Sequence, residues 1–199
     1  LRMLFFFFFV IGLFQSVQSV AGFGRGEMLL LFAIMNIVDV IVQITFFRGF
    51  TDLQRLVRTG EFDLVLTKPI SPLFWSAFRI VDFFDIVTIP VAIYFLWYAV
   101  RALPTTPTLT HIFISVIMLA LGIVVAFALN LLIASLTFIT VEVENTRWMY
   151  RDMMYQTRFP EEIFPRGVRV FFTFLVPILV IVYFPTKALL GGIAVWMFL

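Results

Sequence analysis

The stretch Arg48–Pro72 reads RGFTDLQRLVRTGEFDLVLTKPISP and forms a polar segment between two long hydrophobic runs. The whole chain is 62% hydrophobic, with 27 Phe in 199 residues, only 13% charged residues and a mean hydropathy of +1.08. Soluble domains rarely have this composition, and several of the apolar runs are long enough to cross a bilayer. The contrast predicts an all-α, multi-pass membrane protein that docks a soluble partner through its polar segment.

The first half of this segment has the pattern of an amphipathic helix. Apolar residues recur at helical spacing on one face, at Phe50, Leu53, Leu56 and Val57. The opposite face carries Asp52, Gln54, Arg55 and Arg58. Gly60 follows at the position where a glycine ends a helix, and Pro69 and Pro72 stiffen the later part of the segment. Two interpretations stay open: a helix that anchors the fold at the membrane surface, or a coupling helix that inserts into a groove of a cytoplasmic ATPase.

Four apolar runs extend outward from the segment, at residues 1–21, 28–47, 73–100 and 110–141. A helix crosses a hydrocarbon core of about 30 Å with roughly 20 residues, so the chain predicts a bundle of roughly five or six transmembrane helices. Residues 170–199 are apolar but contain Pro177 and Pro185, which favours two half-helices or a re-entrant hairpin over one straight span. We expect both ends to be incomplete, because the chain begins at Leu1 and stops inside an apolar run.

The basic residues indicate the orientation of the bundle. Residues 48–79 include Arg48, Arg55, Arg58, Lys68 and Arg79, whereas the flanking turns contain only Arg25 and Arg101. Loops on the cytoplasmic side of a membrane carry an excess of Lys and Arg. The polar segment is therefore predicted to be cytoplasmic, and the turns at residues 22–27 and 101–110 to lie outside.

Polar side chains inside the apolar runs form a second set of candidate residues. One run carries a stripe at i, i+3 and i+7, made of Asn36, Asp39 and Gln43, and the next carries charges three residues apart at Arg79, Asp82 and Asp85. Lipid-facing helices do not carry Asp, so these side chains must face another helix or an aqueous path. We favour contacts between helices, with an internal Arg79–Asp82 pair. The alternative is a secondary transporter or channel with a proton or cation path along the three aspartates.

The residue types exclude several classes of function. The chain has no cysteine, which excludes disulfides and thiolate sites, and His111 is its only histidine, which excludes histidine metal clusters and histidine-assisted serine catalysis. It has no Gly-x-x-x-x-Gly-Lys-Ser/Thr loop for ATP, and its basic residues form no dense patch for nucleic acid. We therefore predict that the chain is not an enzyme and has no cofactor or metal of its own.

Three stretches carry a resemblance to a known family. They are Gly26–Leu30 (GEMLL), Arg58–Phe74 (RTGEFDLVLTKPISPLF) and Arg158–Gly192 (RFPEEIFPRGVRVFFTFLVPILVIVYFPTKALLGG). In this order they resemble the permeases of type-2 ABC exporters, and most closely the branch of ABC-2 permeases often encoded as two unlike membrane subunits with one ATPase. Two features depart from that pattern: the acidic pair Glu161–Glu162, and the high charge of residues 145–155.

The resemblance implies one transmembrane permease domain over residues 1–199, with residues 48–72 as its cytoplasmic coupling segment. It implies cytoplasmic ABC ATPase subunits, a second identical or related permease and membrane lipid as partners, in the plasma membrane of a bacterial cell. On this hypothesis the residues that couple to the ATPase are Asp52, Arg55, Arg58, Gly60, Glu61 and Asp63, and those that line the pathway or a helix interface are Asn36, Asp39, Gln43, Asp82 and Asp85. The substrate cannot be read from the sequence, and a structural or assembly subunit of a larger membrane complex stays open as a third hypothesis.

The resemblance also bears on the C-terminal part. Simple alternation of spans would leave residues 142–169 cytoplasmic. The family pattern instead implies a fifth helix at residues 145–159, an outer re-entrant hairpin at residues 160–185 and a sixth helix from Ala188 onward. We favour the family topology, with the charges of the fifth helix paired at a protein interface, because an unpaired charge at the centre of a bilayer costs about 2.5–3.5 kcal/mol.

Overall fold

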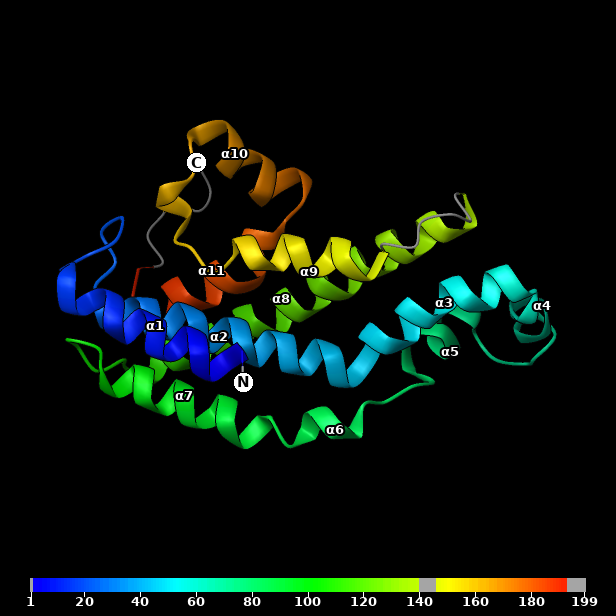
Figure 1. Cartoon of the computed structure of the whole chain (residues 1–199), viewed down its shortest axis with the longest axis horizontal. Coiled ribbons are helices and arrows are strands. Elements are labelled where there is room, and N and C mark those ends of the chain that lie inside the picture. The colour runs from blue at the N-terminus through cyan, green and yellow to red at the C-terminus, as the bar shows by residue number, and fades with distance from the viewer. Residues whose placement is uncertain (1, 140–145, 193–199) are drawn as a thin grey trace.

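The computed structural model describes residues 2–139 and 146–192, and all regular elements in these ranges are helical, as the sequence predicts. The α-helices are α1 (Arg2–Ser16), α2 (Arg25–Val42), α3 (Arg48–Thr59), α4 (Glu61–Leu66), α5 (Pro72–Phe78), α6 (Phe83–Ile86), α7 (Ile89–Arg101), α8 (Leu109–Ser135), α9 (Thr146–Gln156), α10 (Arg166–Val170) and α11 (Ile178–Leu189). Two π-helical segments, η1 (Gln43–Phe47) and η4 (Phe171–Leu175), and two 3-10 turns, η2 (Leu136–Phe138) and η3 (Glu161–Ile163), complete the set. In Figure 1 the long helices run along the molecule, and α3, α4 and α5 gather at one end.

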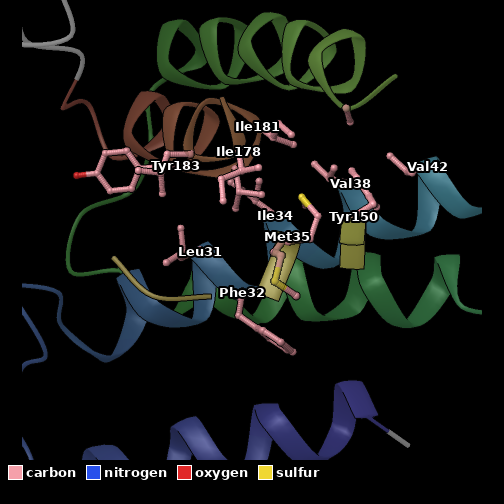
Figure 2. Close-up of a cluster of buried hydrophobic side chains, with 14 of the residues drawn as sticks. Leu31, Phe32, Ile34, Met35, Val38, Val42, Tyr150, Ile178, Ile181 and Tyr183 are labelled. Atoms are coloured by element: carbon pink, nitrogen blue, oxygen red, sulfur yellow. The ribbon is translucent and has the colours of Figure 1, made fainter. Parts of the chain in front are cut away.

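The helix α2 is the centre of the bundle. Of its most apolar window 72% is buried inside the protein, against 17% and 22% for the corresponding windows of the helices at Phe83–Arg101 and Leu109–Phe138. Figure 2 shows side chains of α2 and α11 that point toward one another, with Tyr150 of α9 beside them. The outer helices therefore keep a broad apolar surface for lipid or another membrane protein, whereas α2 is enclosed on nearly all sides.

The polar segment does not begin as a separate helix. The second apolar run was predicted to end at residue 47, but α2, η1 and α3 form one continuous helix from Arg25 to Thr59, 35 residues long. At 1.5 Å per residue this helix is about 50 Å long, so its last third reaches beyond a hydrocarbon core of about 30 Å. It ends where the sequence predicts, at Gly60, whose φ of 73° and ψ of 0° lie in the left-handed region that glycine adopts without strain.

The third apolar run is broken, contrary to the prediction of one transmembrane helix over residues 73–100. The chain forms α5, stops at Arg79, and starts again as α6 and α7, so that the candidate span is Phe83–Arg101. Asp82 begins α6 because its carboxylate accepts a hydrogen bond from the backbone N–H of Phe84 at 3.2 Å. Pro90 lies in the first turn of α7, where it removes no helical hydrogen bond and so does not interrupt the helix.

The remaining spans agree with the prediction in part. The run 110–141 forms α8 and η2, an apolar helix of 30 residues over Leu109–Phe138, and residues 140–141 lie outside the described ranges. The first helix, expected near 1–21, ends at Ser16 and is followed by a tight turn in which Val20 and Phe23 exchange backbone hydrogen bonds. Three described helices are long and apolar enough to cross a membrane, or four with the bent C-terminal pair.

The C-terminal part bends sharply at Pro177. The stretches Arg166–Leu175 and Ile178–Leu189 meet at an angle of 98°, a geometry that a broken span and a re-entrant loop share. The expected fifth helix is present as α9, within the residue range that the family pattern implies. The expected boundary of the hairpin at Pro185 is wrong, because α11 continues through this proline to Leu189. Most of the expected sixth helix, from residue 193 onward, lies outside the described residues.

Candidate functional site

The apolar face of α3 holds the end of the long helix against the bundle. Phe50, Leu53 and Leu56 are each less than 5% exposed, as the periodicity predicts. The ring of Phe50 lies 5.3 Å from that of Phe127 on α8, and Phe46 lies 5.2 Å from the same ring. Aromatic pairs at this spacing add to the free energy of simple burial. The part of the helix that leaves the apolar core is therefore packed on α8 along one side and is not a loose extension.

A chain of ion pairs joins α3 to its neighbours. The Arg55 guanidinium binds Asp52 one turn earlier at 3.0 Å, and both carboxylate oxygens of Glu61, at the start of α4, at 2.9 Å. Asp52 in turn binds Arg79 at the end of α5. Planar guanidinium groups that bind carboxylates through two nitrogens fix direction as well as distance. These residues tie α3, α4 and α5 into one unit, which we call the polar joint and define as residues 48–82.

The break before α6 is tied to the long helix in the same way. The Nε atom of Arg48 lies 2.6 Å from Asp82 Oδ2, and the backbone N–H of Asp82 donates to the carbonyl oxygen of Ile44 at 3.4 Å. The internal Arg79–Asp82 pair predicted from their spacing is therefore wrong: Arg79 is bound to Asp52, and Asp82 to Arg48. The two residues do not share a helical face, because the chain leaves its helix between them.

The outer side of the polar joint is α4. Glu61 and Asp63 are exposed, as are Leu64 and Leu66 at 66% and 57%, while Val65 is buried. Phe62 packs edge-on against Phe138 of η2 at 5.3 Å. The hydrogen bonds from Arg55 hold the pKa of Glu61 below its ordinary value. This short helix therefore presents carboxylates and apolar side chains together on a surface anchored from beneath.

The residues predicted to couple to a partner divide into two groups. Arg58, Gly60, Glu61 and Asp63 lie on the outer surface. Asp52 does not face outward, since its side chain is only 21% exposed between Arg55 and Arg79. Arg55 is half exposed, but it is engaged with two carboxylates of the joint. Arg55 and Asp52 thus stabilise the joint from within, which the sequence pattern of one polar face did not reveal.

The predicted polar stripe of α2 faces protein. Asn36 is 1% exposed and its Nδ2 donates to the carbonyl oxygen of Phe32 at 2.7 Å, and Asp39 is 9% exposed. Gln43 is half-buried at the first position of η1. The burial of Asn36 and Asp39 agrees with contacts between helices, while Gln43 lines a polar cavity.

This cavity lies between the long helix, the break before α6, and α9. Its volume is about 590 Å³, within the range of small-molecule sites, and it is open on one side. It is lined by Gln43, Phe47, Arg48, Thr51, Asp52, Ile80, Asp82, Phe84, Asp85 and Arg151. Gln43 from the first predicted set meets Asp82 and Asp85 from the second set here, whereas Asn36 and Asp39 do not line the cavity. Arg151 and Thr51 were not predicted, and Arg151 joins from a distant part of the sequence.

A comparison with known families agrees with the architecture. The family model described as "ABC-2 family transporter protein" matches residues 1–199. The chain belongs to the ABC-2 transporter family. It is thus an ABC-2 type permease, a multi-pass membrane transport protein. No curated protein and no solved structure matches the chain.

At its other end, this ABC-2 permease has a second charged cluster between η3 and α11. The hydroxyl of Tyr183 donates to Glu162 Oε1 at 2.5 Å, and Lys187 Nζ lies 3.2 Å from the same oxygen and 4.7 Å from the ring centre of Phe23. Burial, and then the neighbouring Glu162 charge, raise the pKa of Glu161. Glu162 of the acidic pair that departs from the family pattern therefore links η3 to α11, and Lys187 of α11 contacts the turn before α2.

Proposed function

We propose that this chain is the transmembrane permease of an ATP-driven exporter, forms the translocation pathway, and couples to a separate cytoplasmic ATPase through residues 48–72. Membership of the ABC-2 family carries the proposal. The arrangement of the polar joint supports it. One helix runs from the buried centre of the bundle into the joint, so a displacement at its exposed end reaches the core without crossing a flexible loop.

The joint has the rigidity that coupling requires. Nucleotide-driven movement of an ATPase reaches the spans only if the connection between them does not absorb it. Here Arg55 links α3 to α4, Asp52 links α3 to α5, and Arg48 links the long helix to the cap of α6. Trp75 of α5 also contacts two cations, with Lys68 at 5.1 Å and Arg79 at 4.6 Å from its ring centre.

The surface offered to the ATPase is the exposed face of α4 with the end of α3. It combines charged side chains with the exposed apolar residues Leu64 and Leu66, which is the mixture found where one protein seats in a groove of another. The excess of basic residues in the segment supports a cytoplasmic position for this face.

The other partners follow from the outer helices. The spans at Phe83–Arg101 and Leu109–Phe138 bury little of their apolar surface within one chain. We propose that they face lipid and a second permease, identical or related, in the plasma membrane of a bacterial cell. Two ATPase subunits would then bind, one to each polar joint, with residues 1–199 acting as a single permease domain.

Charge reversal on the outer surface tests the coupling role. We expect the double variant Arg58→Glu/Asp63→Lys to bind its ABC ATPase about tenfold more weakly, because two exposed contacts of up to about 1 kcal/mol each become repulsive. The full-length protein is purified from native membranes with its associated ATPase, and bound ATPase and ATP hydrolysis are measured in liposomes. The control is Arg101→Glu, at the C-terminal end of α7 and far from the polar joint in the sequence. It should leave ATPase binding and ATP hydrolysis at the wild-type level.

Two results would contradict the proposal. Unchanged ATPase binding and hydrolysis in the double variant would leave α3 and α4 as an anchor at the membrane surface. Substrate flux that is independent of ATP and abolished by ionophores would favour the secondary transporter, in which Asp39, Asp82 and Asp85 carry cations.

A further inference from the structure

The charges that line the 590 Å³ cavity are not all paired with one another. Asp82 is bound to Arg48, and Asp52 to Arg55 and Arg79. Among the side chains that the structure describes, none donates a hydrogen bond to the half-buried carboxylate of Asp85 or forms an ion pair with it. The cavity therefore contains a carboxylate that forms no direct ion pair with a described side chain, although the positive charge of Arg48 acts on it across the cavity.

The second group that forms no ion pair with a described side chain is Arg151 of α9. Its Nη2 donates to the hydroxyl of Tyr155 at 3.2 Å and its guanidinium lies 4.9 Å from the ring centre of Trp148. Neither partner is an anion, and within the described ranges no carboxylate lies in ion-pair distance of it. A guanidinium held by a phenol and an aromatic ring keeps donors available for an oxyanion.

The cavity also lies at a definite depth. A helix that starts to cross at Arg25 spans a core of about 30 Å in roughly 20 residues, which brings it to about residue 45. Gln43 and Phe47, which flank that position, both line the cavity. Phe84, another lining residue, belongs to a candidate span and is 87% exposed, so an exposed apolar ring borders the polar space. This is the level of phospholipid headgroups.

We propose that this cavity binds a zwitterion that carries an ammonium and a phosphate, namely the headgroup of an ethanolamine phospholipid, with the ammonium at Asp85 and the phosphate at Arg151. An ammonium has three N–H donors for a carboxylate, and a phosphate accepts from a planar guanidinium. The acyl chains leave past Phe84 toward the bilayer. The argument for this site does not rest on the coupling role of residues 48–72, although Arg48, Thr51 and Asp52 of that segment line the cavity, and it gives the lipid partner a defined position.

Native mass spectrometry of the purified full-length protein in detergent tests the proposal. The probes are phosphatidylethanolamine, phosphatidylglycerol with the same acyl chains, and soluble phosphoethanolamine. We expect the wild type to retain phosphatidylethanolamine in preference to phosphatidylglycerol. Asp85→Asn should weaken binding of the ethanolamine lipid about tenfold and that of phosphatidylglycerol little, since one charge-assisted hydrogen bond contributes about this factor. Arg151→Gln should weaken both lipids.

The arms of the experiment separate the two sources of this headgroup. Phosphoethanolamine that binds the wild type as tightly as the lipid, with the same loss in Asp85→Asn, would assign the site to a soluble zwitterion. The control Arg101→Gln removes a cation outside the cavity and should retain the wild-type preference. Equal binding of both lipids to the wild type, or an unchanged preference in Asp85→Asn, would overturn the proposal. Neither Asp85→Asn nor Arg151→Gln removes a described ion pair, so both variants should unfold near the wild-type temperature.

Discussion

The contact between α3 and α5 gives the sharpest test of the polar joint. Gly49 is fully buried at the point where the long helix passes α5. A Cβ atom added at Gly49 would stand 2.8 Å from the carbonyl carbon of Ala77 and closer still to the carbonyl oxygens of Ser76 and Ala77. Because the obstacle is backbone, no side-chain rotation relieves the overlap, and α5 must move away from α3.

The magnitude of Gly49→Ala follows from two opposing effects. Forcing an extra carbon into packed structure costs up to about 3 kcal/mol, and replacing glycine by alanine inside a helix returns about 1 kcal/mol. We expect a net loss of about 2 kcal/mol in the free energy of unfolding. For a chain of this size that loss lowers the apparent Tm by roughly 4–8 °C.

The assay is thermal unfolding in detergent, with Gly167→Ala as the matched control. Gly167 lies in α10, and a Cβ there would have no atom within 4 Å. The same substitution should therefore leave the apparent Tm unchanged or raise it by up to about 3 °C, through helix propensity alone. Equal shifts in the two variants would refute the close approach of α3 and α5, and with it the rigidity assigned to the joint.

Two pH dependences of opposite sign follow from the carboxylates outside the spans. Because Arg55 lowers the pKa of Glu61, the stability from this link is present above the ordinary pKa of 4.5 and is lost as pH falls through the lowered pKa. Glu61→Gln should therefore reduce the loss of stability at acid pH in unfolding curves. Because burial raises the pKa of Glu161, its contribution is present below 4.5 and is lost as pH rises through the raised pKa. Glu161→Gln should remove that loss and make the protein more stable than the wild type at neutral pH, and an identical pH profile in either variant would contradict the corresponding contact.

Local patterns in the sequence predicted the features that depend on neighbouring residues. The apolar face of α3, its end at Gly60 and the long helix α8 all follow from periodicity and glycine placement, which act within a few turns. The burial of Asn36 and Asp39 follows from the cost of a polar group in lipid.

The sequence failed where distant residues decide the structure. The helix stops after Arg79 and restarts at Asp82, where Asp82 binds Arg48 and the carbonyl oxygen of Ile44, and no local pattern contains that contact. The continuity of α2 and α3 was missed for the opposite reason: the change from apolar to polar residues at Arg48 marks a change of solvent and not a break in the backbone. Arg151 could be found only once α9 was placed beside the joint.

The irregular turn η1 gives these features a common position. Segments Gln43–Phe47 and Arg48–Thr59 are one helix, but the first has π-helical hydrogen bonds, and such turns inside α-helices are frequent at functional sites. Gln43 and Phe47 at its two ends line the cavity, and the carbonyl oxygen of Ile44 within it holds Asp82. A headgroup in the cavity and a displacement of the polar joint therefore act on the same turn of the same helix. Occupancy of the cavity is then expected to change how firmly the long helix connects the joint to the core, so lipid binding and coupling are linked through η1 and not through a contact between ligand and ATPase.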